Sequence, residues 1–86
     1  MPAKPLVSIV IPAYNQGAFV AETIESVLSQ EYDHTEVIVL DDGSKDATPE
    51  IIQGFRDRVT AVRHDNMGEN PTVNRGLEIA QGEIVC

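Results

Sequence analysis

Uninterrupted apolar runs alternate along the chain with amphipathic segments. Residues 6–11 (LVSIVI) and 36–41 (EVIVLD) are apolar and β-branched over most of their length, which is typical of strands covered on both faces. Between them, residues 18–30 carry apolar positions at three- and four-residue spacing, the pattern of an amphipathic helix. The predicted inner face of this helix consists of Phe19, Val20, Thr23, Ile24, Val27 and Leu28.

The second half of the chain repeats this alternation with shorter elements. Thr-Pro at residues 48–49 and Asn-Pro at residues 70–71 each predict a helix start, with the polar residue as N-cap and proline in the first turn. Gly82 ends the last helix. Residues 58–64 alternate and predict a more exposed strand near a sheet edge, and residues 83–86 begin a fourth strand. The predicted inner faces of the two helices consist of Ile51, Ile52, Phe55, Val73, Leu77 and Ala80.

The order β-α-β-α-β-α-β predicts one small α/β domain. Short connections between alternating strands and helices favour a Rossmann-like three-layer α/β/α architecture with a mostly parallel sheet. In such sheets ligands bind beyond the carboxyl ends of the strands. Three polar loops are expected at that edge: residues 12–15 (PAYN), 41–44 (DDGS) and 64–70 (HDNMGEN).

Charge and cysteine content exclude several classes of partner. Fourteen acidic residues against six basic ones give a net charge of -8, which argues against nucleic-acid or anionic-membrane binding. A phosphate-bearing ligand stays open, because backbone N–H groups or a cation can neutralise it locally. Cys86 is the single cysteine, so no internal disulfide forms and a reducing compartment is expected. No apolar run reaches the ~18 residues of a membrane span, and the start suits no signal peptide, so a cytoplasmic protein is predicted.

Asp41 and Asp42 stand at the tip of a strand that otherwise suits a protein interior. Burying either carboxylate is costly unless something pairs with it. The pair therefore belongs either to a solvated turn or to a ligand site that needs acceptors. His34 and His64 have no partners at metal-ligand spacing, so ordinary histidines are expected. The glycine motifs of dinucleotide and ATP loops are absent, and a phosphoacceptor receiver domain lacks its acidic pair here.

The segments "VSIVIPAYNQGAFVAETIESVLSQ", "EVIVLDDGSKDATPEII" and "NMGENPTVNRGLEIAQGEIV" resemble the amino-terminal half of inverting family 2 glycosyltransferases. The catalytic domain of that family has the nucleotide-diphospho-sugar transferase fold called GT-A. The resemblance runs from about Val7 to the end, and "IPAYN" and "DDGSxD" are its best motifs. It implies that residues 1–86 are an incomplete nucleotide-sugar-binding half. The Asp-x-Asp that binds Mg²⁺ or Mn²⁺, the general base and the acceptor pocket would follow Cys86, so this segment alone is expected to be inactive.

The resemblance also implies roles for particular residues. Pro12, Ala13 and Tyr14 would wrap the base and ribose, with Tyr14 as a stacking face. Asp42 would accept a hydrogen bond from uracil N3–H. The full set of expected nucleotide-sugar-binding residues is Pro12, Ala13, Tyr14, Asp41, Asp42, Gly43, Asp65, Asn66 and Asn74.

At Arg75 the sequence departs from the family pattern. Family members often carry arginine just before the helix asparagine, where this chain has Val73, and Arg75 follows Asn74 instead. Because one helix position turns a side chain by about 100°, a contact between Arg75 and the diphosphate is not expected.

By resemblance, the parent protein would transfer a sugar from a UDP-sugar to an acceptor hydroxyl with inversion. It would serve polysaccharide or cell-envelope biosynthesis, in the cytoplasm or on the cytoplasmic face of a membrane. A non-catalytic nucleotide-binding or protein-interaction module remains the alternative. The open edge of the strand at residues 83–86 predicts self-association.

Overall fold

The computed structural model describes residues 6–29 and 35–85, and of residues 83–85 the backbone only. The elements are β1 (Val7–Ala13), α1 (Val20–Leu28), β2 (Thr35–Asp42), α2 (Thr48–Gln53), β3 (Thr60–His64), α3 (Glu69–Ile79) and β4 (Glu83–Val85). This order confirms the alternation of strands and helices predicted from the hydrophobic pattern. Gln30, His34 and Cys86 lie outside the described residues.

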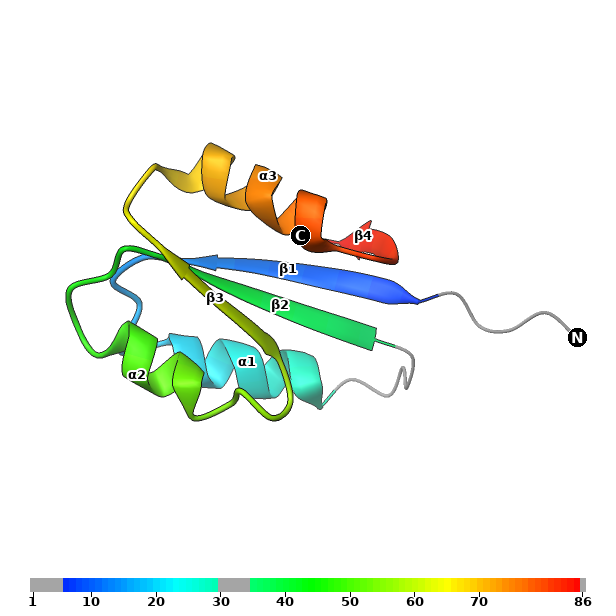
Figure 1. The fold of residues 1–86 in the computed structure, drawn as a ribbon. Helices are drawn as coiled ribbons and strands as arrows, with labels where there is room; N and C mark the ends of the chain where they lie inside the picture. The colour runs from blue at the N-terminus through cyan, green and yellow to red at the C-terminus, as the bar shows by residue number, and fades with distance from the viewer. Residues whose placement is uncertain (1–5, 30–34, 86) are drawn as a thin grey trace, which may run out of the picture.

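The strands form one parallel sheet in the order β3-β2-β1-β4. Helix α3 covers one face of the sheet, whereas α1 and α2 lie together on the other (Figure 1). The three-layer α/β/α architecture is therefore confirmed. Strand β3 stands at one edge of the sheet, as its mixed pattern predicted, and β4 stands at the other.

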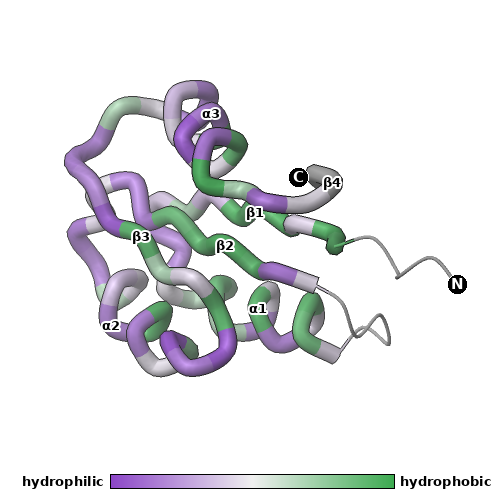
Figure 2. Tube along the Cα trace, turned by 45° about the vertical axis from the view of Figure 1, so that its right-hand side comes forward, coloured by the Kyte–Doolittle hydropathy of each residue, from purple (hydrophilic) through white to green (hydrophobic). Residues whose placement is uncertain are grey.

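The core is divided by the sheet into two clusters. Successive strand residues point to opposite faces of the sheet. In β2, the side chain of Val39 therefore packs on the face covered by α1 and α2, whereas Ile38 and Leu40 pack on the face covered by α3. All three side chains are fully buried. Figure 2 shows hydrophobic residues along β2, with hydrophilic residues in the loops that join the strands to the helices. The alternation continues past Leu40 and sends the side chains of the two aspartates at the strand tip to opposite faces.

Gly76 lets α3 lie close to the sheet. A Cβ at this position would fall 2.4 Å from Cγ1 of Val10 and 3.0 Å from Cδ1 of Leu40. Carbon atoms pack at about 3.5–4.0 Å, so any side chain here would push the helix outward. This close approach sets the height of α3, and hence of the loop before it, above the ends of β1 and β2.

Both predicted helix caps are wrong. Helix α2 begins at Thr48 itself, and the Thr48 N–H donates to the Asp46 carboxylate at 2.9 Å. Helix α3 begins at Glu69, so Asn70 lies inside its first turn. A carboxylate two residues upstream replaces the threonine as hydrogen-bond acceptor at the start of α2. The N-cap position of α3 is Gly68, with φ of 94°, and no side chain caps that helix.

Phe19 was predicted to lie in the core, and this prediction is wrong. Its residue exposure is 63%, whereas Val20 and Ile24 are buried. Phe19 precedes the first turn of α1 with φ of -127°, so it does not share the inner helical face. Strand β3 is shorter than the predicted strand at residues 58–64, and this difference also has a local cause. The N–H groups of Arg58 and Val59 donate to the Phe55 carbonyl in a turn, and the strand begins only at Thr60.

Candidate functional site

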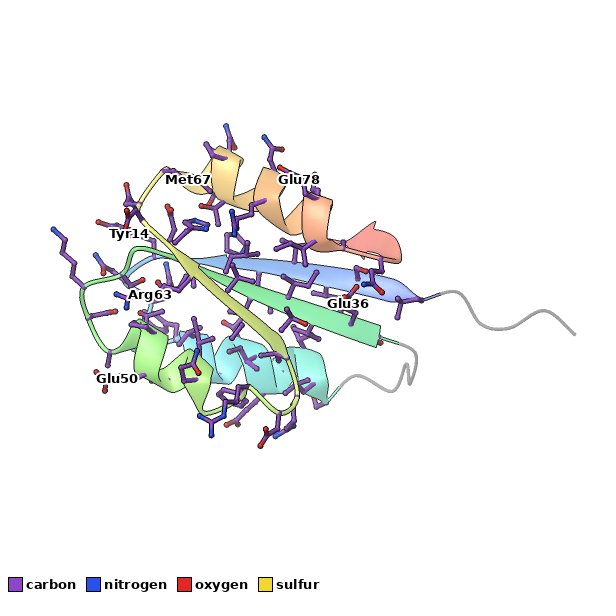
Figure 3. All side chains as sticks on the ribbon, viewed as in Figure 1. Tyr14, Glu36, Glu50, Arg63, Met67 and Glu78 are labelled. Carbon is purple, nitrogen blue, oxygen red and sulfur yellow. The ribbon has the colours of Figure 1, made fainter. Side chains whose placement is uncertain are left out.

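The loops after β1, β2 and β3 meet at the carboxyl edge of the sheet. A cavity of about 420 Å³, here called the edge pocket, opens between them. Figure 3 labels Tyr14 and Met67 at this end of the molecule and Glu36 at the opposite end. The residues that line the edge pocket are Pro12, Ala13, Tyr14, Gln16, Asp42, Asn66, Gly68, Glu69 and Thr72.

The carboxylate of Asp42 is the most heavily bonded group of the edge pocket. The residue is 3% exposed. Its Oδ1 accepts from the Met67 N–H at 2.8 Å and lies 3.1 Å from Nε2 of His64. Its Oδ2 accepts from the Gly68 N–H at 3.0 Å and from the Asn66 amide at 3.2 Å. These donors explain how a carboxylate is tolerated at the tip of a buried strand, and they tie the loop after β3 to the end of β2.

These contacts also determine the charge of Asp42. Burial, the largest single influence, raises its pKa. Hydrogen bonds outweigh burial and hold the pKa below its ordinary value; in decreasing order of influence, they involve the Met67 N–H, the Thr72 hydroxyl, the Gly68 N–H and the His64 ring. Asp42 is therefore ionised at neutral pH and acts only as an acceptor.

The loop that carries Tyr14 is fastened to the loop after β2. We call this set of bonds the loop cross-tie. It consists of Asn15 N–H to Ser44 Oγ at 2.8 Å, Gln16 N–H to Thr48 Oγ1 at 2.8 Å, Gly17 N–H to Asp46 Oδ2 at 3.0 Å and Lys45 N–H to Asn15 Oδ1 at 2.9 Å. The cross-tie holds Tyr14, which is 45% exposed, at the edge pocket.

The sequence showed Thr48 only as a helix cap and Asp46 only as the last residue of the DDGSxD motif. Their side chains instead accept hydrogen bonds from backbone groups about 30 residues earlier in the chain, with separations of 29 and 32. The only sequence signal is the presence of three side chains with acceptor oxygens, Ser44, Asp46 and Thr48, in the segment after β2. That signal indicates acceptors near a strand end but does not name the loop that donates to them.

Asp41 faces away from the edge pocket. Its Oδ1 accepts from the Ser44 N–H at 3.0 Å, and its Oδ2 lies 3.2 Å from Nε of Arg63 in an ion pair whose geometry falls short of a hydrogen bond. Asp41 lines a different cavity of about 630 Å³ between α2 and β3. The two adjacent carboxylates therefore lie on opposite faces of the sheet.

Other residues expected at the site lie near the edge pocket but do not line it. Gly43 has φ of 70°, and a Cβ there would lie 2.5 Å from the Asn66 nitrogen. Gly43 and Asp65 line a neighbouring cavity of about 540 Å³ together with Asn66. Asn74 is exposed on α3. The structure thus gathers five of the nine expected residues, namely Pro12, Ala13, Tyr14, Asp42 and Asn66. Four further residues line the pocket that were not expected from the sequence: Gln16, Gly68, Glu69 and Thr72.

Two further features concern metals and membranes. Among the side chains of residues 6–29 and 35–82, no group of three or more from His, Cys, Asp and Glu is placed to hold a metal ion. The described side chains therefore do not fit a divalent-cation site, and the predicted ligands beyond Cys86 stay a prediction. None of the described helices is long and apolar enough to cross a membrane.

Several solved glycosyltransferases share this fold. The mannosyltransferase PcManGT from Pyrobaculum calidifontis, in complex with GDP-Man and Mn²⁺, has a TM-score of 0.86 at 27% identity, over 95% of this chain and 26% of that chain. TarS from Staphylococcus aureus, in complex with UDP-GlcNAc, also has a TM-score of 0.86, at 28% identity over 93% of this chain and 25% of that chain. These neighbours are GT-A enzymes, so the Rossmann-like GT-A fold predicted for this chain is confirmed.

Curated relatives agree with the structural neighbours. TuaG of Bacillus subtilis, a putative teichuronic acid biosynthesis glycosyltransferase, is 40% identical over 96% of this chain and 34% of its own length. Glycosyltransferase GlyG of Streptococcus pneumoniae is 37% identical over 93% of this chain and 28% of its own length. The chain thus spans about a quarter to a third of the length of these relatives. A family model described as "Glycosyl transferase family 2" matches residues 8–86, a range that includes all three loops of the carboxyl edge. The chain therefore belongs to glycosyltransferase family 2.

Proposed function

We propose that this chain is the nucleotide-sugar-binding part of an inverting glycosyltransferase that transfers a sugar from a UDP-sugar to an acceptor hydroxyl. One observation carries the proposal: Tyr14 and Asp42, from two different loops, line the same pocket at the carboxyl edge of a parallel sheet. Ligands of open α/β sheets bind at this edge. Support also comes from TarS, which is described in complex with UDP-GlcNAc, and from glucosyl-3-phosphoglycerate synthase of Mycobacterium tuberculosis, described with UDP and Mn²⁺.

The charge of Asp42 favours a base with a ring N–H, rather than a lone pair, at the position that faces the carboxylate. Uracil offers N3–H, and a hydrogen bond from this group to an ionised carboxylate is worth about 1.5–3 kcal/mol. Cytosine presents a lone pair at N3, and Asp42 has no proton to donate to it because its pKa is lowered. Stacking of the base on Tyr14 adds about 1–3 kcal/mol for either pyrimidine. Asp42 is therefore the residue that selects uracil over cytosine, whereas Tyr14 contributes to the binding of both pyrimidines and does not distinguish between them.

The remaining parts of the proposal concern the whole protein. A divalent cation, Mg²⁺ or Mn²⁺, would stabilise negative charge on the departing diphosphate, and PcManGT is described with Mn²⁺. A general base would activate the acceptor hydroxyl. The name of TuaG, which refers to teichuronic acid biosynthesis, favours a polymer of the cell envelope as the product. We place the reaction in the cytoplasm or at the cytoplasmic face of a membrane.

Calorimetry with UDP, CDP and GDP tests the base assignment without altering the protein. UDP should bind about 10- to 100-fold more tightly than CDP, the factor expected for one charge-assisted hydrogen bond. GDP is a useful third ligand because guanine also carries an N–H beside its carbonyl. Equal affinities for UDP and CDP would refute the role of Asp42. UDP binding by a protein that transfers no sugar would favour the alternative of a non-catalytic nucleotide-binding module.

A substitution at Asp42 gives a second, less direct test. We expect Asp42→Ala to weaken UDP binding by about 10- to 100-fold. The same change leaves the N–H groups of Met67 and Gly68 without an acceptor, so it also disturbs the loop after β3. The comparison of nucleotides is therefore the decisive experiment, and the variant serves to support it.

A further inference from the structure

The carboxylate of Asp42 has no vacant acceptor position. An ionised carboxylate offers about four lone-pair sites. In this structure four nitrogen donors occupy them: the N–H groups of Met67 and Gly68, the amide of Asn66 and Nε2 of His64. The Thr72 hydroxyl, which also contributes to the lowered pKa of Asp42, donates to the Gly68 carbonyl at 2.7 Å and so occupies none of them. A nucleobase N–H can therefore reach Asp42 only when one of these donors leaves.

Three of the four donors are held in place. Met67 and Gly68 donate through the backbone, so removing either bond would require the start of α3 to move. The His64 side chain is 11% exposed, and its Nε2 also lies 3.1 Å from Oγ1 of Thr72. Losing any of these donors would disturb the packing of the loop on the sheet.

The fourth donor, Asn66, is free to leave. Its side-chain amide makes the longest of the four contacts to the carboxylate, at 3.2 Å, and the residue is exposed. The same nitrogen also donates to the main-chain oxygen of Asp42 at 3.1 Å. A rotation of the side chain would release Oδ2 while the Asn66 backbone stays packed against Gly43.

We propose that Asn66 is a built-in competitor for the nucleobase: its amide occupies the Asp42 oxygen that the base N–H requires, and binding exchanges one N–H donor for the other. This inference rests on the proposed function, because it assumes that the base donates to Asp42. According to this inference, the Asn66 side chain lowers the affinity for the nucleotide. Its place in the pocket lining would instead suggest that it contributes to binding. Asn66 keeps Asp42 paired when the pocket holds no nucleotide.

The test is calorimetric titration of UDP into the wild-type protein, Asn66→Ala and Asn70→Ala. Asn66→Ala should bind UDP about 3- to 10-fold more tightly, because binding no longer breaks a hydrogen bond. Asn70→Ala removes the same amide from an exposed position that does not line the edge pocket, and its affinity should be unchanged. The diphosphate of 3-methyluridine, which lacks the N3–H, should show no gain in Asn66→Ala. Asn66→Ser, whose hydroxyl is too short to replace the amide, serves as a second variant and should repeat the gain.

The outcomes separate this inference from the proposed function. Weaker or unchanged UDP binding in both Asn66 variants, with folding intact by thermal denaturation, would overturn the competitor role while leaving the base assignment in place. Equal gains for UDP and 3-methyl-UDP would also overturn it, because the gain would not depend on the N–H. If the wild-type protein binds UDP and 3-methyl-UDP equally, the base assignment itself fails, and the competitor role fails with it.

Discussion

Substituting Gly43 by alanine tests how tightly the loop after β2 packs against the loop after β3. Gly43 has φ of 70°, a conformation that costs an ordinary L-residue about 1–2 kcal/mol. The added Cβ would also lie 2.5 Å from the backbone nitrogen of Asn66 and 3.1 Å from its Cα. Since backbone atoms cannot turn aside as a flexible side chain can, the two loops must separate by roughly 1 Å to reach normal contact.

The magnitude follows from three contributions. Backbone strain destabilises the variant by about 1–2 kcal/mol, and overpacking by about 1–3 kcal/mol. In the opposite direction, alanine reduces the conformational entropy of the unfolded chain, which stabilises the folded protein by about 0.4–1 kcal/mol. The expected loss of unfolding free energy is therefore about 1–5 kcal/mol. A separation of roughly 1 Å also breaks the 3.2 Å contact between Asn66 and Asp42, so the variant should alter nucleotide affinity as well.

Urea denaturation of Gly43→Ala and the wild-type protein measures this loss. Gly68→Ala is not a strain-matched control, because Gly68 has φ of 94° and ψ of 165°, a region that is essentially restricted to glycine. Strain at Gly43, offset by the stiffer unfolded chain, accounts for at most about 1–2 kcal/mol, so a larger loss reports the contact with Asn66. A loss of unfolding free energy below about 1 kcal/mol would show that the loops are not in tight contact and would refute this account of Gly43.

Three further predictions concern acid stability, the loop cross-tie and the sheet edge. Because folding lowers the pKa of Asp42, its stabilising effect is complete above the ordinary aspartate pKa of about 3.9 and is lost as the pH falls through the lower folded value. Urea denaturation should show stability falling below about pH 4, less steeply in Asp42→Asn; equal slopes would contradict this assignment. Asp46→Ala, which loses the acceptor for the Gly17 N–H, should speed hydrogen exchange at that amide, whereas exposed Asp57→Ala should not; the same exchange rate at Gly17 in both variants would show that Asp46 does not hold that N–H. Strand β4 stands at a sheet edge, so we predict concentration-dependent self-association in sedimentation velocity, and a monomer at every concentration would argue against pairing through that edge.

The order and type of the elements were predictable because their signals are local. The apolar run of β2 and the three- and four-residue spacing in α1 each report on neighbours within one or two turns of chain. Boundaries were less predictable where a competing contact acts. Thr48 was a plausible cap, but Asp46 takes its N–H, and Phe19 fits the helical spacing although the helix begins one residue later.

The candidate site was predictable in outline. The order of elements along the chain, with the rule that ligands bind at the carboxyl ends of parallel strands, predicts Tyr14 and Asp42 at the same edge of the sheet. The residues that bond to Asp42 were not predictable, because His64 and Gly68 follow it by 22 and 26 residues and no periodicity records which loop will lie above a strand end. For the same reason the sequence did not show that Asp41 would be paired with Arg63 on the other face.

By itself, the sequence determined the alternation of elements, the parallel sheet and the family, because short-range hydrophobic spacing and motif order carry that information. Only the tertiary structure decided that Asp42 is buried and fully bonded, that Asp41 lies in a separate cavity, and that Asn66 occupies the acceptor a base would need. These facts depend on how closely the loops after β1, β2 and β3 approach one another. That approach is set by packing across the sheet, including the close contact of Gly76 with Val10.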